Sequence, residues 1–213
     1  MVINRDKKFC YRVTHKDNLA HILEHGLVNK DHANADDNFV SIGNHEIIDV
    51  RSSTEVNLNG YGFIGEYVPF YLTPRSIMLF NIITGYYAPK VPKRSKDELV
   101  VIRCCIDTLA KRPKWFFTDG QANDGETTHF NDLNYLNKID WNCIQNSNFS
   151  KSDGDYDRQR RYQAEFLVHK VVPAKYIESI SVYNDKMKTW AEKQVNEGGL
   201  DIPVHIHEPY FFD

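Results

Sequence analysis

The sequence predicts one mixed α+β domain, and three observations support this fold class. Short segments rich in β-branched and aromatic residues are typical of strands, and Leu99–Ile106 is the strongest of them. Segments with helical apolar spacing stand between some of these strands but not between all, so strands and helices interleave irregularly. No linker, internal repeat or low-complexity tract divides residues 1–213, a length that is enough for one domain with its own core.

The first third of the chain begins with a strand and a helix and then becomes polar. A strand is predicted at Phe9–Val13 and a helix at Asn18–His25, with cap residues in Thr14–Asp17 and Gly26 ending the helix. Beyond it we expect a loop, a short helix and a glycine-rich loop, at Asn29–Phe39, Asn44–Ser52 and Ser53–Glu66.

The middle and the end of the chain carry the remaining elements. Tyr67–Leu72 is predicted as a strand, Pro74 starts a helix at Arg75–Ile83, and the basic, proline-containing Ala88–Lys96 is an exposed loop. We further expect strands at Trp115–Thr118, Tyr176–Tyr183 and Ile202–Ile206, helices at Asn131–Ile139 and Lys186–Val195, and loops at Asp119–Thr127 and Gln145–Arg161.

A carboxylate stands within the apolar segment Tyr162–Lys170, which reads as a buried strand with Glu165 in its middle. A lone charge in such a strand is costly unless it is paired or used. Two interpretations stay open on these residues alone. Glu165 either forms a salt bridge with one of the 26 Lys and Arg residues, or it is a catalytic carboxylate held on a rigid strand.

Charge and cysteine content exclude some classes of protein. A net charge of −3 argues against a globally basic nucleic-acid binder, although a local basic groove is still compatible with it. The four cysteines form no CxxC pair, so neither a zinc site nor a disulfide framework is indicated. The N-terminal residues 1–8 lack an apolar signal region, and no apolar run is long enough to span a membrane. We expect a cytoplasmic enzyme or binding domain.

Two motif-like stretches do not carry the chemistry they suggest. Gly60–Gly65 spells G-x-G-x-x-G, but an Asn-rich loop precedes it and a strand follows, so a dinucleotide-binding turn is rejected in favour of a flexible loop. Asp153–Asp157 resembles half of a calcium loop, yet the glycine is misplaced and no Glu stands at loop position 12. No metal site is therefore predicted.

Several basic and aromatic residues are ambiguous when each is taken alone. Arg51 reads as a solvated helix residue. Arg75 stands at a helix N-terminus, where free N–H groups attract anions and a basic side chain is unfavourable, which hints at an anionic partner. Four aromatic residues could either stack on the bases of a nucleic acid or belong to the core, namely Phe70, Tyr71, Tyr86 and Tyr87.

Four blocks of sequence change this picture when they are considered together. In chain order they are Y-R-V-T-H-K-D-N-L, Y-V-P-F-Y-L-T-P-R-S-I-M-L-F, F-F-T-D-G and R-x-Q-A-E-F-L-V. Together they resemble the DarT family, the DNA ADP-ribosyltransferase toxins, over nearly the whole chain. The resemblance implies an ADP-ribosyltransferase fold, with a split mixed β-sheet core, flanking helices and long active-site loops. It also implies transfer of ADP-ribose from NAD, without a metal, onto a base of single-stranded DNA, usually a thymine ring nitrogen.

The resemblance also assigns roles to residues and names a partner. Glu165 and Arg51 would be catalytic, with an NAD-binding loop and helix at Asp36–Ser53 and a base-presenting loop within Asp119–Glu165. The NAD pocket would be lined by Arg12, Val13, Thr14, His21, Val28 and Arg51. DNA would be contacted by Tyr71, Arg75, Ser76, Ile77, Met78, Leu79, Phe80 and Gln121. The expected protein partner is a DarG-like antitoxin with a macrodomain that removes the modification, and no membrane is involved.

Physical chemistry is consistent with these implied roles and leaves alternatives open. Breaking the nicotinamide–ribose bond develops positive charge on the ribose, which a fixed carboxylate such as Glu165 stabilises. Arg51 suits binding of phosphate or of a deprotonated base better than proton abstraction, because guanidinium stays protonated in proteins. Gln121 stands where the family often has His. The alternatives are an acceptor in RNA, protein or a DNA guanine, and a non-catalytic nucleic-acid-binding module.

Overall fold

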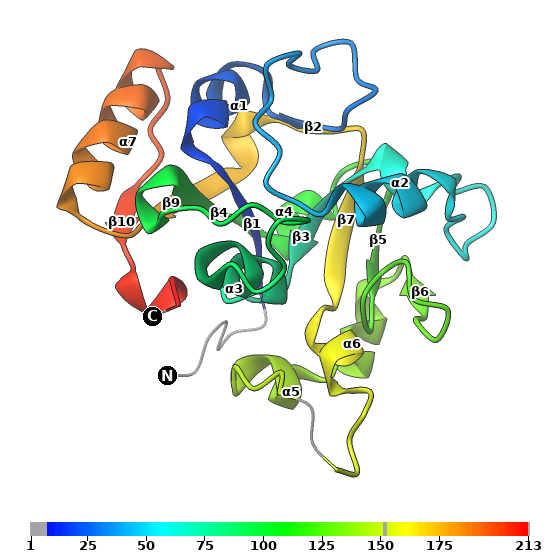
Figure 1. Ribbon diagram of the computed structural model, residues 1–213. Helices are drawn as coiled ribbons and strands as arrows, with labels where there is room; N and C mark the ends of the chain where they lie inside the picture. The colour runs from blue at the N-terminus through cyan, green and yellow to red at the C-terminus, as the bar shows by residue number, and fades with distance from the viewer. Residues whose placement is uncertain (1–7, 151–152, 213) are drawn as a thin grey trace.

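The computed structural model describes residues 8–150 and 153–212, and its centre is an eight-stranded mixed sheet (Figure 1). The strand order is β10-β9-β4-β1-β3-β7-β5-β6, and all neighbours are antiparallel except β9 and β10. The strands are β1 Phe9–His15, β3 Tyr67–Tyr71, β4 Leu99–Cys105, β5 Trp115–Thr118, β6 His129–Phe130, β7 Glu165–His169, β9 Ile177–Val182 and β10 Val204–Ile206. Two short strands, β2 Leu27–Val28 and β8 Val171–Val172, form a separate pair.

Helices pack on both faces of this sheet. They are α1 Leu19–His25, α2 His45–Ser53, α3 Ile77–Thr84, α4 Ile106–Leu109, α5 Trp141–Gln145, α6 Arg158–Tyr162 and α7 Asp185–Glu197. Side chains cap the N-termini of the longer ones, since Asn44, Ser76 and Asn184 each accept a backbone N–H of the first turn. These caps explain why the helices begin where they do.

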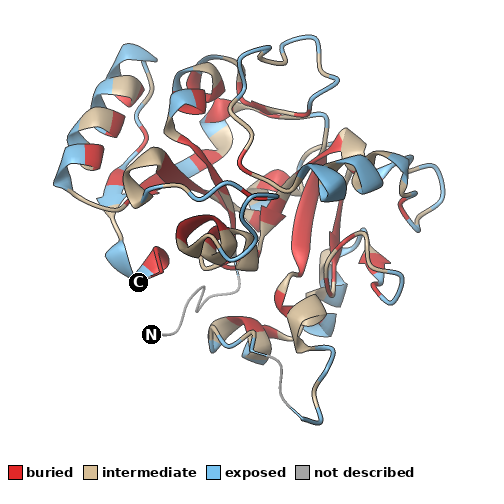
Figure 2. Cartoon of the chain, in the orientation of Figure 1, coloured by how far each residue is buried: buried red, intermediate tan, exposed pale blue. Residues whose placement is uncertain are grey.

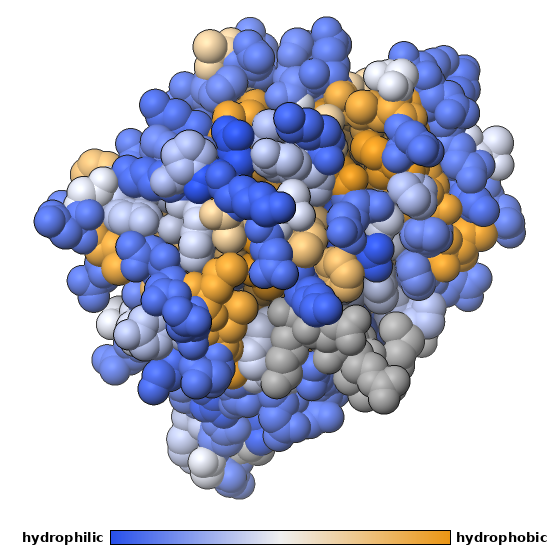
Figure 3. Space-filling model, turned by 180° about the vertical axis from the view of Figure 1, so that it is seen from behind, coloured by the Kyte–Doolittle hydropathy of each residue, from blue (hydrophilic) through white to orange (hydrophobic). Residues whose placement is uncertain are grey.

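The alternation of apolar residues along β4 explains the layering. Val100 and Ile102 point into the core shared with α1 and α7, whereas Leu99 and Val101 point into the core shared with α3 and the C-terminal residues 210–212. Buried residues accordingly follow the strands through the centre of the molecule, and the exposed ones lie on helix faces and loops (Figure 2). Seen from behind, the surface is mostly hydrophilic with a few apolar patches (Figure 3).

The sheet is nearly divided between β1 and β3, which are joined through the single register pair Tyr11 and Tyr71. The Leu72 N–H donates to the Ala164 carbonyl, which directly precedes β7. The backbone groups of successive residues in a strand point to alternate sides, so the backbone of Pro69, three residues before Leu72, faces β1. Proline has no N–H to continue the β1–β3 ladder there, and its free carbonyl accepts a 3.0 Å hydrogen bond from the Arg12 side chain instead. Pro69 therefore opens a seam in the sheet.

Most predicted elements are confirmed, including the α+β fold class with its split mixed sheet, and the G-x-G-x-x-G stretch is a loop followed by β3 as expected. Several boundaries differ by one or two residues, and two further differences change the place of a candidate site residue. Tyr162 ends helix α6, so Glu165 is the first residue of β7 rather than the middle of a longer strand. Ion pairs between Asp155 and Arg158 and between Asp157 and Arg161 favour this helical turn. Arg75 was expected to be the first residue of the next helix, but α3 begins at Ile77 and Ser76 caps it, so Arg75 lies before the helix.

The sequence analysis also missed short elements. Residues 131–139 form only a 3-10 helix, Leu133–Lys138, instead of the expected α-helix. The strands β2, β6 and β8 have two residues each, and α4 and α5 have four and five. Segments this short leave no periodic pattern, since a helical repeat needs several turns to be recognised.

Gly26 provides a test of the fold. It ends α1 with φ +84°, and a Cβ at this position would collide with the Val172 carbonyl oxygen on β8. We expect Gly26→Ala to lower the free energy of unfolding by about 1–3 kcal/mol, measured by denaturant titration. Gly125→Ala is the control, because nothing lies within 4 Å of its Cβ, and it should change stability by less than about 0.5 kcal/mol. Equal losses in both variants would contradict the assignment of Gly26.

Candidate active site

A cleft of about 470 Å³ lies along the seam of the sheet. It is bordered by β1, α2, β3, α3 and α6, by residue 165 at the start of β7 and by residue 121 in the loop after β5. Predicted site residues that line it are Arg12, Val13, Thr14, Arg51, Tyr71, Ile77, Met78, Gln121 and Glu165. The fold therefore brings together residues that are more than a hundred positions apart in the sequence.

Glu165 is the centre of the hydrogen bonds in this cleft. Only 2% of the residue is exposed, and its Oε1 accepts from Arg51 Nη1 at 2.9 Å and from the Ala122 N–H at 3.0 Å. Its Oε2 accepts from Arg51 Nη2 at 2.9 Å. A carboxylate oxygen has two lone pairs, so Oε2 keeps room for another donor. The salt-bridge interpretation is thus correct for this structure, and the catalytic one is compatible with it.

Arg51 reaches Glu165 from the last turn of α2, a helix in which no residue is fully buried. Burial alone lowers the Arg51 pKa, but the charge and hydrogen bonds of Glu165 outweigh it, so the net effect is a raised pKa. A guanidinium with a raised pKa cannot take a proton from a substrate. Arg51 is consequently a fixed cation that still has unused N–H donors directed at the cleft.

The Ala122 peptide is held on both sides. Its N–H donates to Glu165, and its carbonyl lies 3.0 Å from His129 Nε2. His129 Nδ1 accepts the Asn57 N–H at 2.9 Å, so the proton resides on Nε2 and is donated to Ala122. Burial lowers the His129 pKa, which keeps this tautomer neutral near pH 7. Sequence analysis missed Ala122, because a backbone donor has no side-chain signature.

Arg12 makes the cleft an attractive site for anions. Burial, together with the neighbouring Arg51 charge, lowers the pKa of Arg12 to about 10, so it is still protonated near neutral pH. The charged residues that line the cleft are Arg12, Arg51 and Glu165, which leaves one positive charge in excess. That charge is partly shielded from water and therefore acts strongly on a bound ligand.

A second cavity of about 380 Å³ adjoins the first and shares Arg12 and Arg51 with it. His21 and Val28, the remaining predicted NAD residues, line this second cavity rather than the cleft. Other lining residues common to the two are Phe39, Ser41, Ile48 and Pro69. The predicted NAD residues thus line one continuous hollow, which is made of these two adjoining cavities.

Tyr71 stands directly opposite Glu165 in the β3–β7 register, so the two side chains share one face of the sheet. Burial, and next the Glu165 charge, raises the Tyr71 pKa, which keeps the hydroxyl protonated as a donor. Gln121 lies nearby with its Oε1 accepting from Gln163 at 3.2 Å. Gln159 and Gln163 also line the cleft, and their spacing of four residues next to the apolar strand was a signal that the sequence analysis overlooked.

The predicted DNA residues around α3 separate into two groups. Ile77 and Met78 line the cleft, whereas Leu79 has no exposed surface and Ser76 caps the helix by accepting the Leu79 N–H. The side chains of those two residues are therefore not available to DNA. Phe80 packs on Phe149 and Phe212.

Arg75 is engaged by the C-terminal segment. Its guanidinium lies 4.0 Å from the centre of the Phe212 ring and donates to the Pro209 carbonyl. Its backbone carbonyl accepts from the Tyr162 hydroxyl at 2.8 Å. Arg75 thus links the start of α3 to the C-terminal residues and to α6.

Two further features concern the described residues 8–150 and 153–212, namely metal ligands and membrane-spanning helices. No group of three or more His, Cys, Asp or Glu side chains in this part of the chain is arranged to hold a metal ion. No helix in the same residues is both long and apolar enough to cross a membrane.

Comparisons with known proteins find a matching family and several similar proteins. A profile of the family described as "ssDNA thymidine ADP-ribosyltransferase, DarT" matches residues 11–212. A DNA ADP-ribosyl transferase of Escherichia coli O127:H6 is 31% identical over 211 residues, which cover 99% of this chain and 96% of that protein. A DNA ADP-ribosyl transferase–DNA ADP-ribosyl glycohydrolase fusion protein of Thermosipho africanus is 28% identical over 95% of this chain and 48% of its own length.

Solved structures agree with the sequence matches. The structure resembles Thermus sp. 2.9 DarT in complex with ADP-ribosylated ssDNA, with a TM-score of 0.86 and 26% identity over 100% of both chains. It also resembles the same Thermus protein in complex with NAD+, with a TM-score of 0.81 and 25% identity over 97% of this chain and 98% of that chain. Because the family profile covers almost the whole described chain, the protein belongs to the DarT family of single-stranded-DNA thymidine ADP-ribosyltransferases.

Proposed function

We propose that this protein transfers ADP-ribose from NAD onto thymine in single-stranded DNA and releases nicotinamide. The observation that carries this proposal is the buried Glu165 carboxylate, held by Arg51 where two adjoining cavities meet. An electrostatic stabiliser of a developing positive charge has to be fixed in place and shielded from water. Membership of the DarT family supports the same reaction.

NAD fits the continuous hollow as a co-substrate. Its pyrophosphate carries two negative charges, and we place it beside Arg12 and Arg51, the two cations common to both cavities. Val13 and Thr14 would then border the nicotinamide end, and His21 and Val28 the adenosine end. The Thermus relative solved in complex with NAD+ supports this use of the fold.

Glu165 acts while the bond between nicotinamide and its ribose breaks. Both electrons of that bond leave with nicotinamide, and the ribose carbon becomes positively charged. The carboxylate stabilises this charge, and its free Oε2 lone pair accepts a hydrogen bond from a ribose hydroxyl. A thymine ring nitrogen forms the new bond to the ribose carbon and gives up its proton, so the products are nicotinamide, modified DNA and one proton.

Arg51 stabilises charge in this scheme and does not act as a base. Two of its five N–H groups bind Glu165, and the others are free to meet the NAD phosphates and the negative charge left on thymine as its proton departs. The raised pKa of Arg51 is consistent with this role, because burial is outweighed by the Glu165 carboxylate.

The acceptor base would enter the cleft from the side of α3. Tyr71, Ile77, Met78 and Gln121 line this part and offer apolar contact, a hydroxyl donor and a carboxamide. Gln121 has both a donor and an acceptor, so it can pair with the edge of an unpaired thymine in place of the histidine expected from the family. Arg75 and Phe80, which lie near the C-terminal segment, would contact DNA outside the cleft, in addition to the four residues that line it.

Two features of the cellular setting belong to this proposal. The fusion of a DNA ADP-ribosyl transferase to a DNA ADP-ribosyl glycohydrolase in Thermosipho africanus supports a macrodomain antitoxin as the partner of this toxin. All four cysteines are free, which supports a reducing compartment such as the bacterial cytoplasm.

Removing the charge of Glu165 tests the proposal. Gln has nearly the same size, and its single oxygen can still accept the Ala122 N–H and one Arg51 N–H, so Glu165→Gln should still fold and bind NAD, with a lower free energy of unfolding because one hydrogen bond to Arg51 is lost. Transfer to a thymine-containing oligonucleotide should fall by roughly 10²–10³-fold or more, measured with labelled NAD. Glu178→Gln is the control, because it also removes a carboxylate that pairs with an arginine, at 3.6 Å from Arg103, but on β9. Near-normal activity of Glu165→Gln would return Glu165 to a purely structural salt bridge.

The strand state of the DNA gives an independent test. A thymine that is already unpaired needs no unstacking energy of a few kcal/mol before it enters the cleft, so single-stranded DNA should react at least about tenfold faster than its duplex. The measurement is the initial rate of ADP-ribose incorporation into matched single-stranded DNA, duplex DNA and RNA. Equal rates on single and double strands, or a preference for RNA, would be inconsistent with the proposed substrate.

A further inference from the structure

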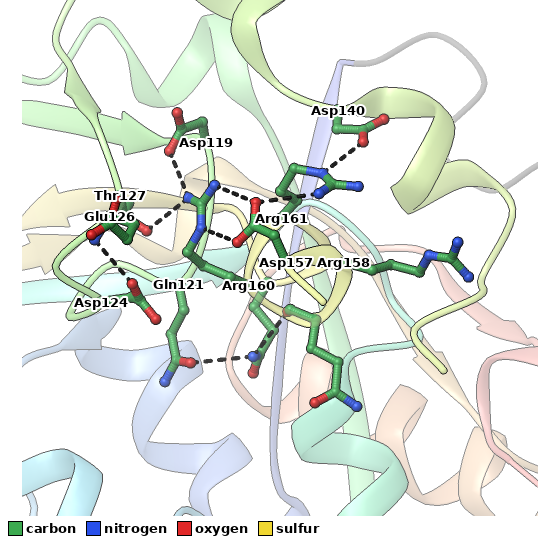
Figure 4. Close-up of polar contacts among 12 residues, drawn as sticks. Asp119, Gln121, Asp124, Glu126, Thr127, Asp140, Asp157, Arg158, Arg160 and Arg161 are labelled. Carbon is green, nitrogen blue, oxygen red and sulfur yellow. Dashed lines mark hydrogen bonds and ion pairs between the residues drawn. The ribbon is translucent and has the colours of Figure 1, made fainter. Parts of the chain in front are cut away.

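Arg160 lies outside both cavities and yet contacts both ends of a loop that borders the cleft, the Asp119–Thr127 loop. Its Nη1 donates to Asp119 Oδ1 at 3.2 Å and to Thr127 Oγ1 at 3.1 Å. Its backbone carbonyl accepts the Gln121 N–H at 3.0 Å. These contacts join α6 to the beginning and the end of the loop (Figure 4).

The Asp119–Thr127 loop is also closed by its own hydrogen bonds. Asp119 Oδ1 accepts the Thr128 N–H at 2.9 Å, so this carboxylate serves the loop and Arg160 together. Within the loop, Asp124 donates its N–H to the Gln121 carbonyl, and Thr127 donates to the Asp124 carbonyl, each at 3.0 Å. A segment tied in this way keeps its shape, so its placement depends on what fixes it from outside.

Asp157 holds Arg160 on the side away from the loop. Arg160 Nε and Nη2 donate to its two carboxylate oxygens at 2.6 and 2.8 Å. The hydrogen bonds to Asp157, followed by the charges of Asp157 and Asp119, outweigh burial and raise the Arg160 pKa. This bidentate pair leaves Nη1 directed at the loop, which approaches so closely that a Cβ on Gly120 would collide with the guanidinium.

We propose that Arg160 is a positioning residue that acts on Glu165 through the Asp119–Thr127 loop. The loop supplies the Ala122 N–H, which donates to Glu165 Oε1, and the Gln121 side chain, which lines the cleft. If the loop shifts, Glu165 loses its backbone donor and the acceptor base loses one wall of its site. A displacement of about 1 Å at a reacting centre can cost about 10²-fold in rate. The proposal rests on the proposed function.

Arg161 offers a matched control in the same helix. It pairs with Asp140, Asp155 and Asp157 at 2.9, 3.0 and 3.2 Å, so it takes part in three ion pairs, whereas Arg160 takes part in two. Within the described part of the chain, no hydrogen bond or ion pair joins the Arg161 side chain to the Asp119–Thr127 loop. Arg161→Ala should therefore reproduce the general cost of removing an α6 arginine without releasing the loop.

Hydrogen exchange tests the mechanical part of the proposal without requiring any catalysis. In Arg160→Ala, exchange in residues 119–127 should speed up by about tenfold or more, because hydrogen bonds to a charged group are lost. Arg161→Ala should leave exchange in that segment unchanged. If both variants or neither of them loosened the loop, Arg160 would not be what holds it, and the proposal would fail whatever reaction the protein catalyses.

Steady-state kinetics test the catalytic part. In Arg160→Ala, kcat for transfer to DNA should fall by about 10²-fold while KM for NAD changes less than about twofold, since Arg160 touches neither cavity. Arg160→Lys keeps the positive charge but not the planar guanidinium, so its kcat should lie between those of the unmodified protein and Arg160→Ala. The lysine variant should also fold if Arg160→Ala does not. A KM effect without a kcat effect, or equal losses of kcat in Arg160→Ala and Arg161→Ala, would overturn the positioning role.

A double-mutant cycle with Asp119→Asn identifies the route. If Arg160 acts through Asp119, the loss of kcat in the double variant should be clearly smaller than the product of the two single losses. The losses from Asp119→Asn and Arg161→Ala should instead multiply. Independent effects of Arg160 and Asp119 would rule out the proposed connection.

Discussion

The bidentate pair between Glu165 and Arg51 is the interaction on which the site depends. It joins the first residue of β7 to α2, a helix that buries no residue completely. The carboxylate is nearly inaccessible to water, and breaking a buried pair by removing one partner typically costs about 3–5 kcal/mol. The same contact thus ties Arg51 of α2 to β7, raises the Arg51 pKa and fixes the carboxylate that we propose faces the reacting ribose.

The seam in the sheet explains why this pair has a cavity beside it. A continuous ladder between β1 and β3 would bring the two halves of the sheet together, but Pro69 interrupts it and Arg12 satisfies the exposed carbonyl. One proline therefore provides both the opening and the place of a second cation. The cleft and the adjoining cavity meet at Arg12 and Arg51, where the pyrophosphate of NAD is expected.

Sequence analysis predicted the parts of the fold that have a repeated chemical pattern. The β-branched residues of β4 and the capped helices α1, α3 and α7 carry strong local signals, and all four were expected. Glu165 was singled out by its place in an apolar segment, whereas the expected role of Arg51 came only from the resemblance to the DarT family. Local pattern failed where ion pairs override it, as at Tyr162 in α6, and where an element has too few residues for a period.

Other parts of the site had no sequence signal, because they depend on tertiary contacts. The Ala122 N–H is a backbone group, and any residue but proline supplies one. The fixed tautomer of His129 depends on Asn57, seventy-two residues away. Arg160 lies among three arginines of α6, and only its contacts with Asp119 and Thr127 distinguish it from Arg161.

The most direct measurement of the central claim is a crystal structure of this protein with a non-hydrolysable NAD analogue. The proposed mechanism requires that a hydroxyl of the nicotinamide ribose lies within about 3 Å of Glu165 Oε2 and that the pyrophosphate lies between Arg12 and Arg51. A complex in which the ribose is beyond hydrogen-bonding reach of Glu165, with the pyrophosphate away from both arginines, would contradict it.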